Sequence, residues 1–131
     1  MSVSKKSDFI ILLVKSILAL NLIIFGMNKF FLFLPEIEMA PAANQFFKQL
    51  FASGYLMQLT GAVELLVAIG IFFHRTVLFA IIALAPISVN IVAFHLFLDP
   101  TTILPALVVV TLHIILIYIY KDKFKFLMNS A

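Results

Sequence analysis

Four long apolar segments, separated by short polar breaks, make up most of the chain. The breaks contain prolines or charged residues such as Pro35, Arg75 and Asp99. The apolar segments cover residues 9–34, 55–73, 77–98 and 103–120. At about 1.5 Å per residue, each is long enough, within a residue or two, to cross about 30 Å of hydrocarbon as a helix. The pattern predicts one all-α domain, residues 1–131, built as an integral membrane four-helix bundle.

A fifth, shorter pattern lies between the first two apolar segments. Phe46, Phe47, Leu50 and Phe51 recur at helical spacing within residues 44–53, with polar residues between them. This spacing predicts a short amphipathic helix. Such a helix either lies on the outer membrane interface or packs as a lid over the helix ends, and the pattern leaves both open.

Composition supports a membrane protein and excludes several other classes. The chain is 64% hydrophobic and 11% charged, with a mean hydropathy of +1.19, which is too apolar for a soluble domain of this size. The absence of cysteine excludes disulfides and thiolate metal sites. The first apolar segment is too long for the core of a signal peptide and lacks a small-x-small cleavage site, so it counts as a span.

The distribution of basic residues predicts the orientation. With four spans, one side of the membrane receives six basic residues, and the other receives Lys48 together with Glu36, Glu38 and Asp99. The six are Lys5, Lys6, Arg75, Lys121, Lys123 and Lys125. By the positive-inside rule both termini are cytoplasmic, in what we expect to be a bacterial inner membrane. The basic residues are spread over termini and loops, which argues against a nucleic-acid partner.

Two ionisable residues interrupt the apolar segments at depth. Glu64 has no other charged residue between positions 55 and 73, and Lys29 lies within the first segment. Both should face the protein interior and find a partner, because a charge facing lipid costs several kcal/mol, on the order of 3. We expect them to meet across the bundle, where Gly26 and Gly61 permit close approach. The pair is either a structural ion pair or a site that binds a polar head group or moves a proton.

Other polar residues lie at a similar depth, on the outer half of the predicted bundle. By helical rise, Asn28 and Lys29 lie about 7–9 Å below the outer boundary, Asn90 and Glu64 about 12–14 Å, and His95 about 5 Å. The inner half offers mainly Lys15, expected to extend its amine to the interface, together with Ser16 and Ser88. The asymmetry predicts an outward-facing polar pocket. Its candidate ligand-binding residues are Lys29, Glu64, Asn90, His95, Asn28 and Gln58.

The remaining polar residues have simpler expected roles. Asn21 and Asn28 are seven residues apart and share a helix face, which favours hydrogen bonds between helices. His113 is isolated, so a bond to a neighbouring carbonyl is expected. His95 is close enough to the interface to be simply hydrated. His95 and His113 differ in depth by about 10 Å, which does not suit a haem, and no spacing supports a metal site or a hydrolase.

Several short motifs resemble the DoxX family of small four-helix membrane proteins. Phe25-Gly-Met-Asn-Lys-Phe30 closes the first segment, and Leu59-Thr-Gly-Ala-Val-Glu-Leu-Leu66 lies in the second. The family's G-x-x-K and G-x-x-E-L motifs fall on Gly26/Lys29 and Gly61/Glu64, and the segment with Asn90 and His95 is similar to the family's polar third helix. The resemblance implies a four-helix membrane fold. Some relatives are linked to a terminal quinol oxidase, and others to redox or membrane-protein assembly roles.

These observations favour a pocket that binds a small amphipathic molecule, such as a quinone or a lipid, and the resemblance implies a redox-related setting. No other cofactor is expected. The alternative is a non-catalytic accessory or assembly subunit of a membrane complex, in which Lys29 and Glu64 are structural. Membrane lipid is an expected partner in either case, and a membrane-protein partner or a second copy of the chain remains open. An ion channel is disfavoured, because the inner half lacks a polar path.

Overall fold

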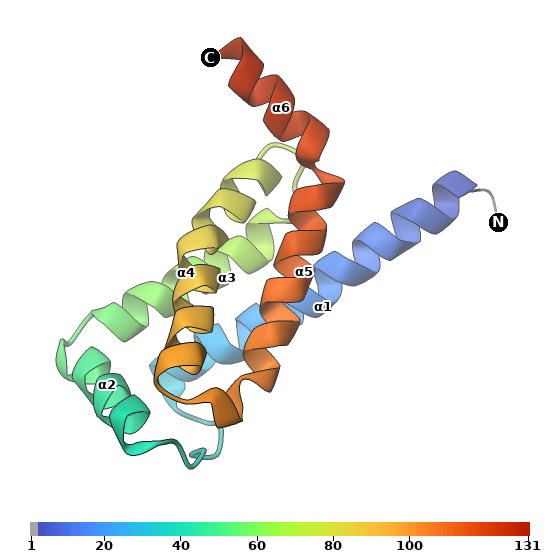
Figure 1. Cartoon of the computed structure of the whole chain (residues 1–131). Coiled ribbons are helices and arrows are strands. Elements are labelled where there is room, and N and C mark those ends of the chain that lie inside the picture. Colours follow the sequence, from blue (N-terminus) through green and yellow to red (C-terminus); the bar gives the residue numbers. More distant parts are fainter. Residues whose placement is uncertain (1–2) are drawn as a thin grey trace.

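The computed structural model describes residues 3–131, which form helices and loops without any strand (Figure 1). The described residues contain six α-helices and one short 3-10 helix. Their bounds are α1 Val3–Phe31, α2 Pro41–Ala52, α3 Leu56–Gly70, α4 Val77–Phe97, η1 Pro100–Thr102, α5 Leu104–Ile119 and α6 Lys121–Ser130. The predicted all-α class is confirmed.

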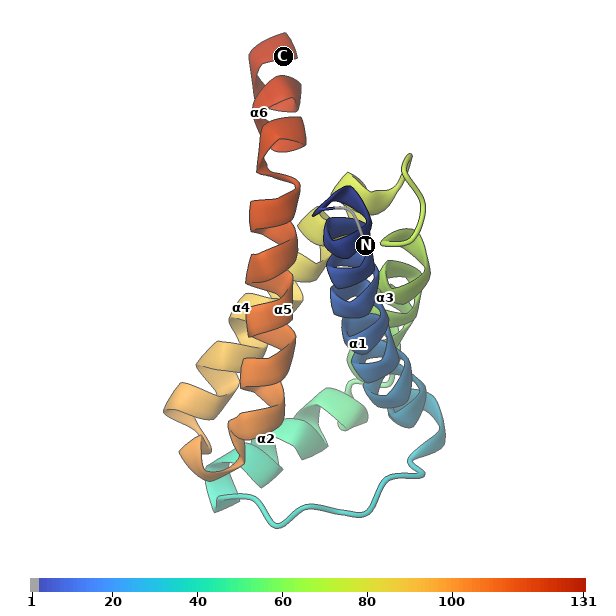
Figure 2. The same ribbon diagram turned by 90° about the vertical axis from the view of Figure 1, so that its right-hand side faces the viewer.

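Four helices form the bundle. α1 packs against α3 and α5, and α4 closes the ring by packing against both α3 and α5. The start of α1 and the whole of α6 lie toward one end of the bundle, whereas α2 and η1 lie at the other (Figures 1 and 2). This arrangement divides the molecule into a terminal end and an α2 end.

The core of the bundle is aliphatic. Leu18 of α1, Leu84 of α4 and Leu116 of α5 are fully buried, and Ile71, in the turn after α3, joins them. Each helix therefore contributes one face to a shared interior. The opposite faces remain exposed and apolar, for example Leu66 on α3. In water such a surface would aggregate, so these faces are suited to contact with lipid.

The helices differ in their capacity to cross a membrane. α1, with 29 residues, and α4, with 21, are each long and apolar enough to span. α3 has 15 residues and α5 has 16, so each rises only about 22–24 Å. They qualify as spans only when joined to a neighbour as a bent pair, α2 with α3 at 87° and α5 with α6 at 60°. The described residues thus contain two to four candidate spans, which indicates an integral membrane protein.

The first helix ends earlier than its apolar sequence predicts. α1 stops at Phe31, and Leu32 adopts a left-handed conformation with φ of 48°. The side-chain oxygen of Asn28 accepts a hydrogen bond of 2.8 Å from the backbone N–H of Leu34. This bond holds the chain in a turn beyond the helix end, although residues 32–34 are apolar enough to continue it.

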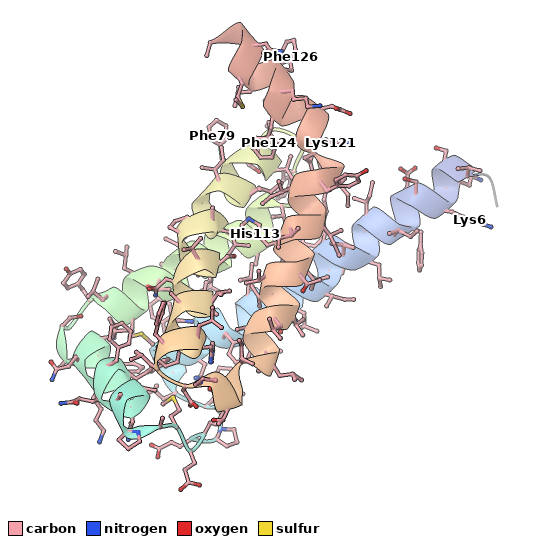
Figure 3. All side chains as sticks on the ribbon, viewed as in Figure 1. Lys6, Phe79, His113, Lys121, Phe124 and Phe126 are labelled. Carbon is pink, nitrogen blue, oxygen red and sulfur yellow. The ribbon has the colours of Figure 1, made fainter. Side chains whose placement is uncertain are left out.

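The last helix was not expected. α6 begins directly after Tyr120, and three lysines and one aspartate lie among its ten residues. Such a charged segment has no apolar run to mark it as a span. Figure 3 shows Phe126 on α6, which extends beyond the bundle, whereas His113 of α5 lies within the bundle.

Candidate functional site

The site begins where α1 and α3 cross. A Cβ atom built on Gly61 would lie 2.8 Å from the carbonyl oxygen of Gly26, and one built on Gly26 would lie 3.1 Å from the carbonyl oxygen of Gly61. Real side chains do not tolerate the shorter of these distances. The two glycines therefore allow the helix backbones to touch, as the sequence predicted.

This close crossing brings Lys29 and Glu64 together. The Nζ atom of Lys29 donates to Oε2 of Glu64 at 2.7 Å, and it also lies 3.4 Å from the carbonyl oxygen of Phe25. The Lys29 side chain is 16% exposed and that of Glu64 is 3% exposed. The predicted meeting of acid and base inside the bundle is confirmed.

A cavity of about 410 Å³ opens beside this ion pair. Residues of all four bundle helices line it, together with residues of α2 and the adjoining loops. The polar lining consists of Asn21, Lys29, Thr60, Glu64, Asn90, His95 and Thr102. Because Ile37, Met39 and Thr102 are also in the lining, the cavity lies toward the α2 end of the bundle.

The amphipathic helix covers this cavity. Pro41 occupies the first turn of α2, where its missing N–H costs nothing. Phe46 and Phe47 of α2 contact the ring of Phe94 on α4, with centroid distances of 5.8 and 5.3 Å. Both phenylalanines line the cavity, as does Leu50. The predicted amphipathic helix is confirmed, and its apolar face packs as a lid.

His95 joins the cavity to the loop between α4 and α5. Its Nδ1 atom lies 3.1 Å from the hydroxyl of Thr102 and 3.3 Å from the carbonyl oxygen of Asp99. The carbonyl oxygen of Asp99 can only accept, so the Nδ1 atom of His95 carries a hydrogen and donates it to that oxygen. The ring is half-buried and is held on the cavity wall rather than left to solvent.

Asp99 organises the same loop. Its buried carboxylate accepts hydrogen bonds from the backbone and hydroxyl of Thr101 and from the hydroxyl of Thr102. It also accepts a longer bond, 3.4 Å, from the backbone N–H of Ala40, the residue before α2. The hydrogen bond from the Thr101 hydroxyl is the main reason that the pKa of Asp99 is lowered. The sequence indicated Asp99 only as a helix break and as one of the outer-side charges, so this latch on α2 was missed.

The hydrogen bonds of Asp99 make the stability of the loop between α4 and α5, and of its contact with Ala40, dependent on pH. Because the folded-state pKa of Asp99 lies below its ordinary value of about 3.9, the carboxylate stabilises the fold at higher pH, and this contribution disappears as pH falls through the lowered pKa. We expect Asp99→Asn to lower the melting temperature at pH 7 and to speed tryptic cleavage at Lys48 severalfold. Glu38→Gln, at an exposed acid in the preceding loop, is the control. A difference between Asp99→Asn and wild type that is as large at pH 3 as at pH 7 would contradict the latch.

The structure separates the six candidate ligand-binding residues. Lys29, Glu64, Asn90 and His95 all line the cavity, whereas Asn28 and Gln58 do not. Asn28 holds the turn after α1. Gln58 has a buried Oε1 atom without a hydrogen bond within the described residues. Of these six residues, only the first four therefore remain candidates for contact with a cavity ligand.

The asparagines of α1 do not bond between helices as predicted. Asn21 donates to the carbonyl oxygen of Ile17 in its own helix at 3.0 Å. Asn28 accepts a hydrogen bond from the backbone N–H of Leu34, in the turn that follows α1. That prediction was wrong. Asn21 instead lines the cavity, which makes it a site residue that the sequence did not identify.

A second buried polar group joins α4 to α5. The Nε2 atom of His113 donates to the carbonyl oxygen of Ile81 at 2.9 Å, so the expected bond to a carbonyl is confirmed. Its Nδ1 atom lies 2.8 Å from the hydroxyl of Ser88. In the neutral ring, Ser88 is then the donor to Nδ1. Both ring nitrogens are engaged, and neither Ser88 nor His113 lines the cavity.

The cavity lining offers polar and apolar groups to a ligand. It combines one ammonium, one carboxylate, one imidazole, amides and hydroxyls with phenylalanine and aliphatic walls. Among residues 3–131, no group of three or more His, Cys, Asp or Glu side chains is placed to hold a metal ion. The arrangement suits recognition of a molecule with one polar and one apolar part.

Comparisons with known proteins identify no relative. No family model matches the chain, and neither a curated protein nor a solved structure matches it. The helical bundle with two to four candidate spans agrees with the fold that the DoxX resemblance implies, and membership of that family stays a prediction.

Proposed function

We propose that this chain is a DoxX-like protein of the bacterial inner membrane that binds a small amphipathic molecule, such as a quinone or a lipid, in a redox-related setting. The observation that carries the proposal is the cavity beside the Lys29–Glu64 pair. Its volume of about 410 Å³ lies within the range of about 300–1,000 Å³ that is usual for small-molecule sites.

The polar wall retains hydrogen-bonding capacity for a ligand. Only Oε2 of Glu64 accepts from Lys29, and the lysine ammonium has three hydrogens to donate. Asn90 makes no hydrogen bond within the described residues although its amide lines the cavity. A carbonyl or hydroxyl head group would meet both donors and acceptors here.

The apolar wall of the cavity can pack against the hydrophobic tail of the proposed ligand. Phe25, Phe46, Phe47 and Phe94 line the cavity together with aliphatic side chains of α4 and α5. An isoprenoid or acyl tail packs favourably against such surfaces. A fully polar solute would gain nothing from them.

The proposed orientation places this site near the outer leaflet. If the basic residues of the terminal end are cytoplasmic, as the positive-inside rule predicts, the α2 end faces the opposite side. A membrane-soluble ligand could then enter laterally between helices, with α2 covering its head group.

The first test is to identify what the protein retains. Full-length protein is purified from native membranes in mild detergent, extracted with organic solvent, and analysed by mass spectrometry for quinones and lipids. We expect one quinone or lipid species at a near-stoichiometric ratio. A protein that carries no such species above the detergent background, but captures a stoichiometric membrane protein, would favour the accessory-subunit alternative.

A matched pair of variants tests the cavity itself. Asn90→Leu removes a polar group that supports no other residue, so the fold should survive while ligand retention falls about fivefold to tenfold, the worth of one hydrogen bond. Val89→Leu places the same side chain at the neighbouring position, which is exposed as Asn90 is but does not line the cavity, and should retain the ligand. Equal retention by the two variants would remove Asn90 from the site.

A further inference from the structure

Basic side chains from three separate parts of the chain converge at the terminal end of the bundle. The ammonium of Lys15, on α1, lies 5.1 Å from the centre of the Tyr120 ring, and that of Lys123, on α6, lies 5.2 Å from it. The two ammonium groups are therefore within about 10 Å of each other. Both ammonium groups make cation–π contacts with Tyr120, which lies at the junction of α5 and α6.

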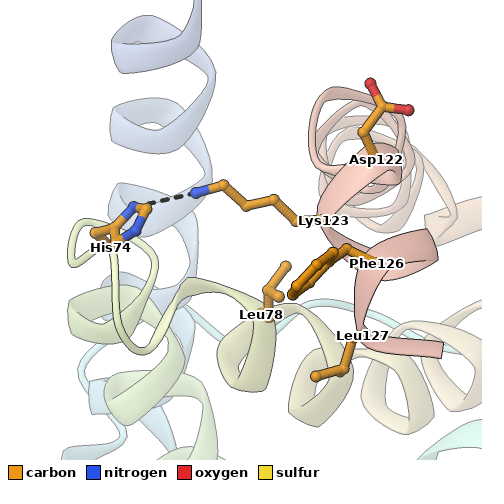
Figure 4. Close-up of a pocket in the computed structure, with 6 residues that line it drawn as sticks. All are labelled: His74, Leu78, Asp122, Lys123, Phe126 and Leu127. Carbon is orange, nitrogen blue, oxygen red and sulfur yellow. Dashed lines mark hydrogen bonds between the residues drawn. The ribbon is translucent and has the colours of Figure 1, made fainter. Parts of the chain in front are cut away.

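His74, in the turn between α3 and α4, completes the cluster. The Nζ atom of Lys123 donates to Nδ1 of His74 at 3.0 Å (Figure 4). We call Lys15, His74 and Lys123 the basic cluster. Its members come from α1, the α3–α4 turn and α6, so the fold, and not a local charge run, assembles them.

Among the described residues, no acidic side chain forms an ion pair with this cluster. The ion pair found within residues 3–131 is Lys29–Glu64, and it lies beside the cavity rather than at the terminal end. Asp122 also lines the cleft beside the cluster, but its carboxylate points away from His74 and Lys123 (Figure 4). Two neighbouring lysines without a carboxylate partner leave a local excess of positive charge, which favours binding of an anion.

The cleft below the cluster is mainly apolar. It has a volume of about 390 Å³, and Leu78, Phe126 and Leu127 form its wall (Figure 4). Phe126 and Met128 of α6 are 75% and 77% exposed. Positive charge above an apolar surface is the chemistry of the membrane interface, where phosphate head groups lie above acyl chains.

We propose that the basic cluster and this cleft bind one anionic phospholipid of the leaflet on the terminal side. Its phosphate lies between Lys15 and Lys123, and its acyl chains follow Leu78 and Phe126. Charge-assisted hydrogen bonds from lysine to phosphate are among the stronger polar contacts in proteins. The bend of 60° between α5 and α6 directs α6 away from the line of α5, so that its apolar residues can reach the acyl region.

This lipid site is independent of the cavity. The basic cluster lies at the terminal end and the cavity toward the α2 end, and they share no lining residue. Failure of one proposal therefore leaves the other standing.

Native mass spectrometry of the delipidated, full-length protein tests the site. Phosphatidylglycerol is titrated against phosphatidylcholine with the same acyl chains, and against inorganic phosphate. We expect preferential binding of one phosphatidylglycerol. Lys123→Gln should weaken it about fivefold, because a lysine near a membrane surface is worth about 1 kcal/mol, and Lys15→Gln/Lys123→Gln should weaken it further.

Two controls separate this effect from loss of fold or of net charge. Lys123→Arg retains the charge and should retain the affinity, whereas Lys48→Gln removes an exposed lysine of α2 and should change nothing. Equal binding of phosphatidylcholine, an unchanged affinity in the double variant, or displacement of the lipid by millimolar phosphate would each overturn the proposal.

Discussion

Lys29→Met is expected to lower the free energy of unfolding by about 3 kcal/mol, because it removes the partner of a buried carboxylate. The Glu64 side chain is 3% exposed and its one ion-pair partner is Lys29 at 2.7 Å. Methionine keeps the length of the lysine side chain but cannot donate to the carboxylate. Thermal or denaturant unfolding of the detergent-solubilised protein measures the loss.

The double variant Lys29→Met/Glu64→Gln is the decisive companion. It removes both charges, so it should be less destabilised than the sum of its two single variants, with a coupling of about 1–3 kcal/mol. Lys48→Met, at an exposed lysine that forms no ion pair within residues 3–131, controls for the loss of a positive charge. Plain additivity of the single effects would show that the two side chains do not interact in the membrane-mimetic protein.

Gly61→Ala is expected to destabilise the bundle by about 1–3 kcal/mol, the usual cost of overpacking. The added methyl group would lie 2.8 Å from the Gly26 carbonyl oxygen and 3.1 Å from Cβ of Lys29. Helix propensity alone predicts the opposite sign, since alanine is favoured over glycine inside a helix by about 1 kcal/mol. The sign of the change in unfolding free energy therefore distinguishes close helix contact from local preference.

Two other glycines provide graded comparisons for this experiment. Gly26→Ala meets its nearest atom at 3.1 Å, so its effect should be smaller than that of Gly61→Ala. Gly54→Ala meets nothing within 4 Å, but φ there is 80°, so any loss comes from the backbone alone. Only Gly61→Ala and Gly26→Ala should also reduce ligand retention, because they separate Lys29 from Glu64. A Gly61→Ala protein as stable as wild type would contradict the close crossing.

The Lys29–Glu64 ion pair could be predicted because a charged side chain inside a membrane helix is costly wherever it faces lipid. Two charges inside apolar segments, each with a glycine three residues before it, had to face inward and find each other. The amphipathic helix was equally accessible, since its apolar residues recur at helical spacing. In both cases a local pattern was enough, and the structure added only the distances.

Other features depend on residues that no local pattern connects. Ser88 and His113 are 25 residues apart, and Asp99 reaches Ala40 across 59 residues. Asn28 looked like a pocket residue by its depth, yet the turn after Phe31 takes its side chain. α6 was missed because its lysines mask the spacing of Phe124, Leu127 and Met128.

The aromatic contact between the lid and α4 offers a way to watch the lid directly. The chain contains no tryptophan, so Phe94→Trp would introduce a single indole in contact with the rings of Phe46 and Phe47. Its emission would shift to longer wavelengths whenever those rings lifted and let water in. Stopped-flow fluorescence could then time how fast α2 admits and releases what the cavity holds.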